Sequence, residues 1–369
     1  MNQLRCYISY SDTISFGRID GLEALYNNGL ISEENYHCLL EIKSLVNGPG
    51  NYDIIDLKEQ AQNVYTEILK VIAERTTVEK YINKRVFHDV LNYNIDKLDE
   101  NFVEQLRALM LEGGIVTDTS ILFFLATIGV ETGEEVMLLE DRDIDNFNGL
   151  SYTWNTRGAG VIQVTGGTQK EFIEYLIDHT DDVEEQNRLK KYCKGFYTYE
   201  DTIEVNGEDK EIDVWDNKYT YNGMTVAEYI AEYYPYESAI WFWSYNQASF
   251  EINGQCLSIN ECIEQYNGVV DDDTMFLAVT CAVNGSEFKA RGRGRFLYSY
   301  NDVTIVGNKI ELTFVDTEDD MVGTPAYDNS YQYTNGDGYR VYKQTSYIPN
   351  GWDDRLDLYN NLIDYFEEH

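Results

Sequence analysis

The sequence predicts a mainly α-helical protein with small β-hairpin insertions, and three observations lead to this fold class. Apolar residues recur at spacings of three and four through residues 19–114, which is the period of an amphipathic helix. The segment 121–130 is apolar throughout and indicates a buried helix. Alternating segments around Asn-Gly, Gly-Asn or Asn-Gly-Asp-Gly turns indicate hairpins, at 203–215, 303–316 and 327–348.

The helical segments follow in order along the chain. In the N-terminal region they are expected over 19–30, 32–46, 56–74 and 101–114, with turns at 27–29 and 47–50. Ser32 is the expected N-cap of the second, and Asp118 or Thr119 that of the buried helix. Further helices are expected at 225–234, 237–247 and 356–368.

Composition narrows the class of protein. The 28 Lys and Arg residues against 65 Asp and Glu give a net charge of −37, which argues against nucleic acid and anionic membranes as partners. An aromatic content of 14% with 31 Tyr argues against an acidic disordered chain. A length of 369 residues at 43% hydrophobic is ample for a buried core. The sequence therefore predicts a soluble, folded protein.

Targeting and metal-binding patterns are missing from the sequence. The start has no basic segment followed by an apolar one, so we expect a chain made in the cytoplasm without a secretory signal. The run 121–130 is too short to cross a bilayer, so no membrane insertion is expected. The six Cys are scattered and the four His far apart, which favours free thiols and predicts no metal and no cofactor. A Cys256–Cys262 disulfide is the alternative.

Two charged runs have several interpretations. Asp271–Asp273 could bind a cation, but the run lacks the spacing of a calcium loop, and three acids more often begin a helix. The three arginines of RGRGR, at 291, 293 and 295, fit either a phosphate site or a structural turn paired with acids. Neither run defines a function.

The candidate catalytic residues lie in the stretch 119–169. Its buried helix ends at Glu131, with Gly133 well placed as a C-cap. A carboxylate at the end of an apolar helix is a general-acid candidate, because desolvation raises its pKa. Glu140 lies in the acidic segment that follows, ahead of the glycine-punctuated loop 156–169.

The nine-residue spacing of Glu131 and Glu140 limits how the two side chains can act together. Nine residues on an unbroken helix would direct Glu131 and Glu140 to opposite sides. They can cooperate only if the helix stops near Gly133 and the chain folds back. The alternative is that these acids merely end an ordinary core helix.

Four segments resemble glycoside hydrolase family 19, the chitinases and related phage endolysins of the lysozyme-like superfamily. FFLATIGVETG is similar to the family's F-L-A-Q-x-x-H-E-[ST]-G, and TRGAGVIQVTGGTQ to its Y-x-G-R-G-x-I-Q-L-T-G-x-x-N-Y. SAIWFWSYN resembles S-A-x-x-F-W, and FLAVTCAVNG resembles F-x-x-[IV]-T-x-x-I-N-G-G. The segments occur in family order over about 115–295.

The resemblance implies a domain organisation. A lysozyme-like, α-rich glycoside hydrolase domain would occupy 115–300, with an insertion at about 171–225 that carries the first hairpin. A helical N-terminal region, 1–114, and a β-rich C-terminal extension with a terminal helix, 301–369, would flank it.

The resemblance also implies roles. Glu131 matches the general acid that protonates the leaving oxygen, and Glu140 the general base that activates water. Thr165 matches a hydroxyl that holds this water. Gln163 and Asn284 match residues that contact the sugar or line the site. Arg293 lies near a family arginine.

The sequence departs from the family pattern at several positions. Val130 stands where the family has His, and Ala159 replaces the Arg of G-R-G, which leaves Arg157 as the nearby guanidinium. Gln169 and Lys170 replace Asn-Tyr. We expect Arg157 and Gln169 to take part in substrate binding, together with Trp243. The aromatic run 241–243 fits a helix core equally well.

These implications give an expected function. The chain would be an inverting glycoside hydrolase that cleaves β-1,4 linkages of N-acetylhexosamine polymers, with peptidoglycan as the preferred substrate. The missing signal suits an endolysin or virion-associated lysin, which acts on the cell wall after release at lysis or as part of a virion. The flanking regions could dock a virion or other assembly partner. The alternatives are a chitinase, which the acidic charge suits better, and a catalytically weak or inactive glycan-binding protein of the same fold.

Overall fold

The computed structural model of the chain divides into two compact units, residues 1–79 and 80–369. In the first unit the structure describes residues 37, 70, 71 and 73–79, which are helical. In the second it describes 80–94, 96, 101–133, 137–141, 147, 150–205, 208–252, 254–284, 288, 290–298, 303–316, 330–334 and 340–368. Ser32 and most of the helices predicted before residue 75 lie outside the described residues.

The first helices of the second unit are α4 (Lys84–Asp89), α5 (Phe102–Glu112) and α6 (Asp118–Thr132). Helix α5 confirms the helix predicted at 101–114. The N-cap of α6 is Thr117, whose hydroxyl accepts the Ser120 N–H. The prediction of Asp118 or Thr119 as this cap was therefore wrong, since the helix already includes both residues.

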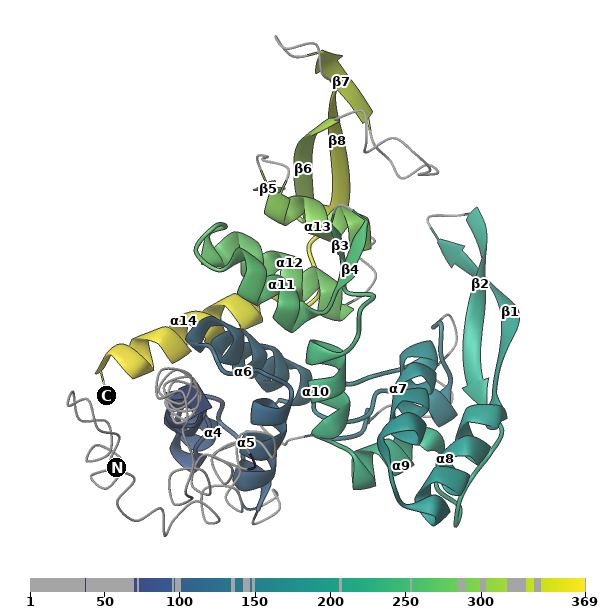
Figure 1. Cartoon of the computed structure of the whole chain (residues 1–369). Helices are drawn as coiled ribbons and strands as arrows, with labels where there is room; N and C mark the ends of the chain where they lie inside the picture. The colour runs from purple at the N-terminus through teal and green to yellow at the C-terminus, as the bar shows by residue number, and fades with distance from the viewer. Residues whose placement is uncertain are drawn as a thin grey trace, which may run out of the picture. The chain divides into compact units, whose positions relative to one another are not determined.

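Helix α6 forms the centre of the core. Its residues 120–129 are all buried, because α11 (Ile259–Tyr266), α12 (Asp272–Asn284) and α14 (Trp352–Glu368) pack around it (Figure 1). The Phe123 ring stacks on Phe276 at 4.6 Å and meets Tyr359 edge-on at 5.1 Å. Burying one such large side chain contributes about 1.5–3 kcal/mol, so this cluster accounts for the uninterrupted apolar sequence.

Two helices precede the first hairpin. After the short 3-10 helix η4 (Trp154–Thr156) come α7 (Gly166–His179) and α8 (Val183–Gly195), which pack together. Strands β1 (Phe196–Val205) and β2 (Glu208–Asn217) then pair antiparallel, with Val205 opposite Glu208, as the Asn-Gly turn predicts. Residues 160–163 form a turn, closed by a bridge between Ala159 and Val164, that leads into α7.

The predicted helices α9 (Val226–Tyr233) and α10 (Glu237–Ser244) are confirmed. The small hairpin of β3 (Phe250–Ile252) and β4 (Gln255–Leu257) was not predicted. RGRGR is helical, within α13 (Ala290–Tyr298), and not a turn. The reason is tertiary: α13 packs on β3, and the Cβ of any residue at Gly294 would lie 2.3 Å from the Glu251 carbonyl oxygen.

The two C-terminal hairpins are confirmed and join into one antiparallel sheet. Strands β5 (Val303–Val306), β6 (Lys309–Asp316), β7 (Ser330–Thr334) and β8 (Arg340–Tyr347) lie in the order β5-β6-β8-β7. Helix α14 begins at Trp352, earlier than the predicted start at residue 356.

The described residues thus form a mainly α protein with small antiparallel sheets. Helices α4 and α5 belong to the same compact unit as α6 and the C-terminal sheet. Among the helices that the structure describes, none combines the length and apolarity needed to cross a bilayer.

Candidate functional site

Helix α6 ends where the sequence predicts. Gly133 is its C-cap, with φ 62° and ψ −177°, and its N–H donates to the Gly129 carbonyl. Glycine adopts this backbone conformation readily, whereas it is costly for other residues. The Thr132 hydroxyl and the Tyr93 hydroxyl bond each other and the Ile128 carbonyl, which closes the last turn. The prediction that the helix stops at Gly133, directly after Glu131, is confirmed.

Glu131 forms an ion pair with Arg355 of α14. The side chain of Glu131 is 20% exposed and that of Arg355 is 3% exposed. Arg355 also donates to the Asn350 carbonyl at 2.6 Å. Burial raises the pKa of Glu131, and the guanidinium of Arg355 opposes this rise. Glu131 is therefore a desolvated carboxyl group held by one fixed cation.

The chain folds back after the helix. The Met137 N–H donates to the Thr132 carbonyl at 3.0 Å. The segment that follows pairs with the glycine-rich loop, since Gly160 donates to the Leu138 carbonyl at 2.8 Å and Leu139 bridges antiparallel to Ala159. Helix α6 therefore does not continue to Glu140, whose segment pairs with the loop instead.

Glu140 is tied to this loop by backbone and side chain. Its N–H donates to the Gly158 carbonyl at 2.8 Å, and its Oε2 accepts the Gly158 N–H at 3.0 Å. The Tyr152 hydroxyl lies 3.4 Å from Oε1. The Glu140 carboxyl group is thus held through Oε2 by the Gly158 N–H, and its Oε1 lies beside the Tyr152 hydroxyl.

The glycines of the loop 156–169 are there because side chains would collide. A Cβ at Gly158 would lie 2.5 Å from Gln163 Oε1, and one at Gly160 would lie 2.2 Å from Ser238 Oγ. Gln163 itself has φ 55°, and its amide donates to the carbonyls of Met137 and Gly160 at 2.9 and 2.8 Å. Gln163 therefore locks the loop to the returning chain.

Thr165 is the N-cap residue of α7, with extended backbone angles, and its side chain makes no capping hydrogen bond. Its neighbour Gly166 lies against Trp215 and Tyr152, which would be 3.1 and 3.4 Å from a Cβ at that position. Thr165 thus belongs to the same loop as Gln163, next to the residues that surround Glu140.

Arg157 and Gln169, near the two ends of the loop, are both buried. Arg157 is 2% exposed, stacks over the Trp154 ring at 3.6 Å and pairs with Glu228 at 3.0 Å. Gln169 is fully buried, and its amide donates to the carbonyls of Arg157 and Val164. Because neither side chain has surface to offer a ligand, the expectation that they contact substrate is replaced by a role in holding the loop.

Three other sequence candidates lie away from this loop. Trp243 is fully buried, edge-on to Phe124, with its indole N–H donating to Ser120 Oγ, so it has no ring face for a sugar. Asn284 ends α12 and donates to the Thr280 carbonyl at 3.1 Å. Arg293 is buried and donates to the carbonyls of Ser249, Phe288 and Ala248. Trp243 and Arg293 are parts of the core.

Sequence reasoning missed Arg355 and Tyr152. Arg355 lies 224 residues from Glu131 in a segment that matches no motif, so only the packing of α14 on α6 could reveal it. Tyr152 precedes the loop by a few residues and is one of many tyrosines.

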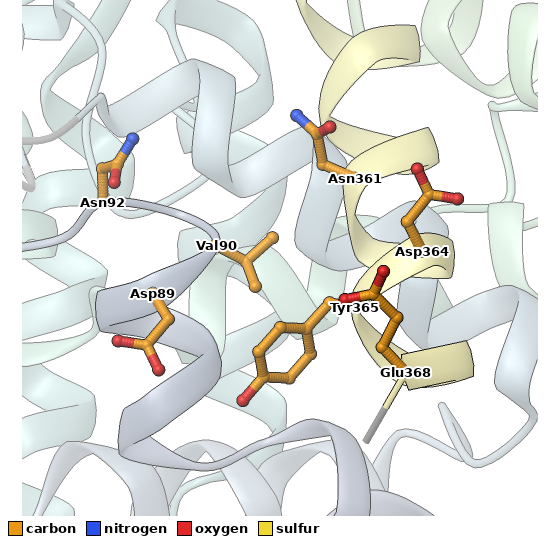
Figure 2. Close-up of a pocket in the computed structure, with 7 residues that line it drawn as sticks. All are labelled: Asp89, Val90, Asn92, Asn361, Asp364, Tyr365 and Glu368. Carbon is orange, nitrogen blue, oxygen red and sulfur yellow. The ribbon is translucent and has the colours of Figure 1, made fainter.

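A separate pocket of about 350 Å³ lies between the end of α4 and the C-terminal turns of α14. Figure 2 shows Asn361, Asp364, Tyr365 and Glu368 on one face of α14, opposite Asp89, Val90 and Asn92. It contains none of the candidate residues. Among the described residues, no three His, Cys, Asp or Glu side chains gather as ligands for a metal ion.

No protein-family model, curated protein or solved structure matches this chain.

Proposed function

We propose that the chain is an inverting glycoside hydrolase with a lysozyme-like catalytic region, as its resemblance to glycoside hydrolase family 19 implies. Its substrates would be β-1,4-linked N-acetylhexosamine polymers, peptidoglycan before chitin. One observation carries the proposal. Helix α6 stops at Gly133, and the chain returns to fix Glu140 against the loop that bears Gln163 and Thr165.

The proposed acid is Glu131. A general acid must hold its proton near the working pH, and burial raises the pKa of this carboxyl group. Its 20% exposure leaves a route to a glycosidic oxygen. In this account Arg355 orients the carboxyl group and stabilises the carboxylate that remains after the proton has been given up.

The proposed base is Glu140. An inverting enzyme needs about 6.5–9.5 Å between its carboxyl groups, so that water fits between base and sugar. The Gly158 N–H donates to Oε2 and so orients Glu140, and Thr165 is available to hold the water.

A second candidate function is glycan binding without hydrolysis. The Glu131–Arg355 ion pair favours it, because a neighbouring guanidinium stabilises the charged carboxylate that cannot act as an acid. Val130, Ala159 and Gln169, where the sequence departs from the family pattern, support the same alternative. In that case the Glu131–Arg355 ion pair would have a structural role and join α6 to α14.

A turbidity assay on purified cell walls, beside an assay on chitin oligomers, tests the proposal. The wild-type protein should clear the walls, and Glu131→Gln should abolish clearing while the protein still sediments with them. Binding without clearing by the wild type would favour the second candidate. Faster cleavage of chitin than of walls would make the protein a chitinase. We further propose that it reaches the wall after lysis or as part of a virion, with the flanking regions as docking segments.

A further inference from the structure

The β1–β2 hairpin exposes two tyrosines on one face. Tyr197 and Tyr199 are 41% and 43% exposed, and alternation along β1 puts both on the same side. Their ring centroids are 6.4 Å apart and their planes differ by 33°. The two rings therefore form a small aromatic platform of two tilted faces.

Polar groups gather at the foot of this platform. Asp216, opposite Tyr197 on β2, accepts the Tyr197 hydroxyl, Thr153 Oγ1 at 2.6 Å and Asn155 Nδ2 at 3.0 Å. Asp216 thus fixes the Tyr197 ring and ties the platform to Thr153 and Asn155.

The platform is continuous with the proposed catalytic loop. Thr153 and Asn155 belong to the segment that leads through η4 to Gly158, whose N–H binds Glu140. On the other side, Trp215 of β2 donates its N–H to the Ser151 carbonyl at 2.9 Å and bridges in parallel to Tyr152, the phenol beside Glu140. A chain-like ligand seated on the hairpin would therefore extend toward Glu140.

The charge of the hairpin restricts the ligand. Residues 196–217 include eight Asp and Glu and one Lys, so an anionic chain or surface would be repelled. The two ring faces suit the C–H faces of pyranose rings.

We infer that Tyr197 and Tyr199 form a binding platform for an uncharged, N-acetylated glycan chain, outside the segments that resemble the hydrolase family. The choice of ligand class rests on the proposed function. The platform would hold the substrate chain beyond the catalytic residues and lower the KM for long chains.

The test measures binding in the full chain with hydrolysis switched off. Tyr199→Thr removes the ring and keeps strand propensity, while Tyr199→Phe keeps the ring. Tyr347→Thr is the matched control, since Tyr347 is a 60% exposed tyrosine on β8. All are made in a Glu131→Gln background and titrated with a chitin hexamer, or sedimented with peptidoglycan strands stripped of their peptides.

Loss of one stacking contact should weaken binding about tenfold in Tyr199→Thr, with no change in Tyr199→Phe or Tyr347→Thr. The glycan that shows this pattern identifies the source of the chain. Equal affinity of Tyr199→Thr and its parent for both glycans would overturn the platform, and so would an equal loss in Tyr199→Phe. If this binding pattern is found and the wild-type protein hydrolyses neither glycan, the platform is supported and only the proposed enzyme is refuted.

Discussion

Arg355 of α14 is ion-paired with Glu131 at the end of α6, across 224 residues of sequence. The pair makes the C-terminal helix part of the surroundings of the proposed acid. A fixed guanidinium and a desolvated carboxyl group have opposite effects on the proton of Glu131, and the chemistry of the site depends on which effect is larger.

Removing one partner should destabilise the protein. Arg355→Leu leaves Glu131 without its counter-charge, which typically costs about 3 kcal/mol for a buried pair. The double variant Glu131→Gln/Arg355→Leu should recover most of that loss, because no charge then stays unpaired. Urea denaturation of the four proteins measures the coupling. A loss below about 1 kcal/mol in Arg355→Leu would show that water already screens the pair.

The pH dependence of stability reports the net effect on Glu131. Its pKa is raised in the folded state above the usual value of 4.5, so the native state holds this proton more strongly than the unfolded chain. The stabilisation is complete below pH 4.5 and is lost as the pH rises through the folded-state pKa. Relative to Glu131→Gln, the wild type should therefore become less stable from pH 4 to pH 7 in urea denaturation. The opposite trend would mean that Arg355 dominates and that Glu131 is ionised.

The packing of the loop predicts a coupled pair of substitutions. In Gly158→Ala the new methyl group would meet Gln163 Oε1 at 2.5 Å, so the Gln163 amide must move from the carbonyls of Met137 and Gly160 and the unfolding free energy should fall by about 1 kcal/mol. In a Gln163→Ala background the same substitution should cost clearly less. Additive losses in this double-mutant cycle would contradict the described contact.

Thr165 offers a test in which stability and activity separate. Its hydroxyl does not cap α7, so Thr165→Val should leave the thermal midpoint unchanged while lowering kcat on cell walls. Thr225→Val is the matched control, because the Thr225 hydroxyl caps α9 and accepts the Glu228 N–H. That variant should lose about 1 kcal/mol of stability and keep its activity. Unchanged kcat in Thr165→Val would remove Thr165 from the proposed mechanism.

Local sequence patterns predicted most of the helices and strands that the structure describes. Contacts between distant segments determine the surroundings of the candidate site. The end of α6 followed from Gly133, and the pairing of β1 with β2 from the Asn-Gly sequence between them, because both depend on residues adjacent in sequence. Arg355 could not be foreseen, since its partner lies on a distant helix.

Residue type alone also gave wrong predictions at positions where burial determines the role of a side chain. Trp243 could stack on a sugar or pack in a core, and only its full burial excludes the first role. The arginines of RGRGR suggested a turn, yet Arg293 satisfies three backbone carbonyls from within a helix.

The anomeric configuration of the first product tests the central claim most directly. Nuclear magnetic resonance of a soluble β-1,4-linked N-acetylglucosamine oligomer, recorded during hydrolysis, distinguishes inversion from retention. The account predicts an α-configured product from the wild type and none from Glu131→Gln. It further predicts that azide partly rescues Glu140→Ala with the same inversion. A β-configured first product, or full activity in Glu140→Ala without azide, would contradict the pairing of Glu131 with Glu140.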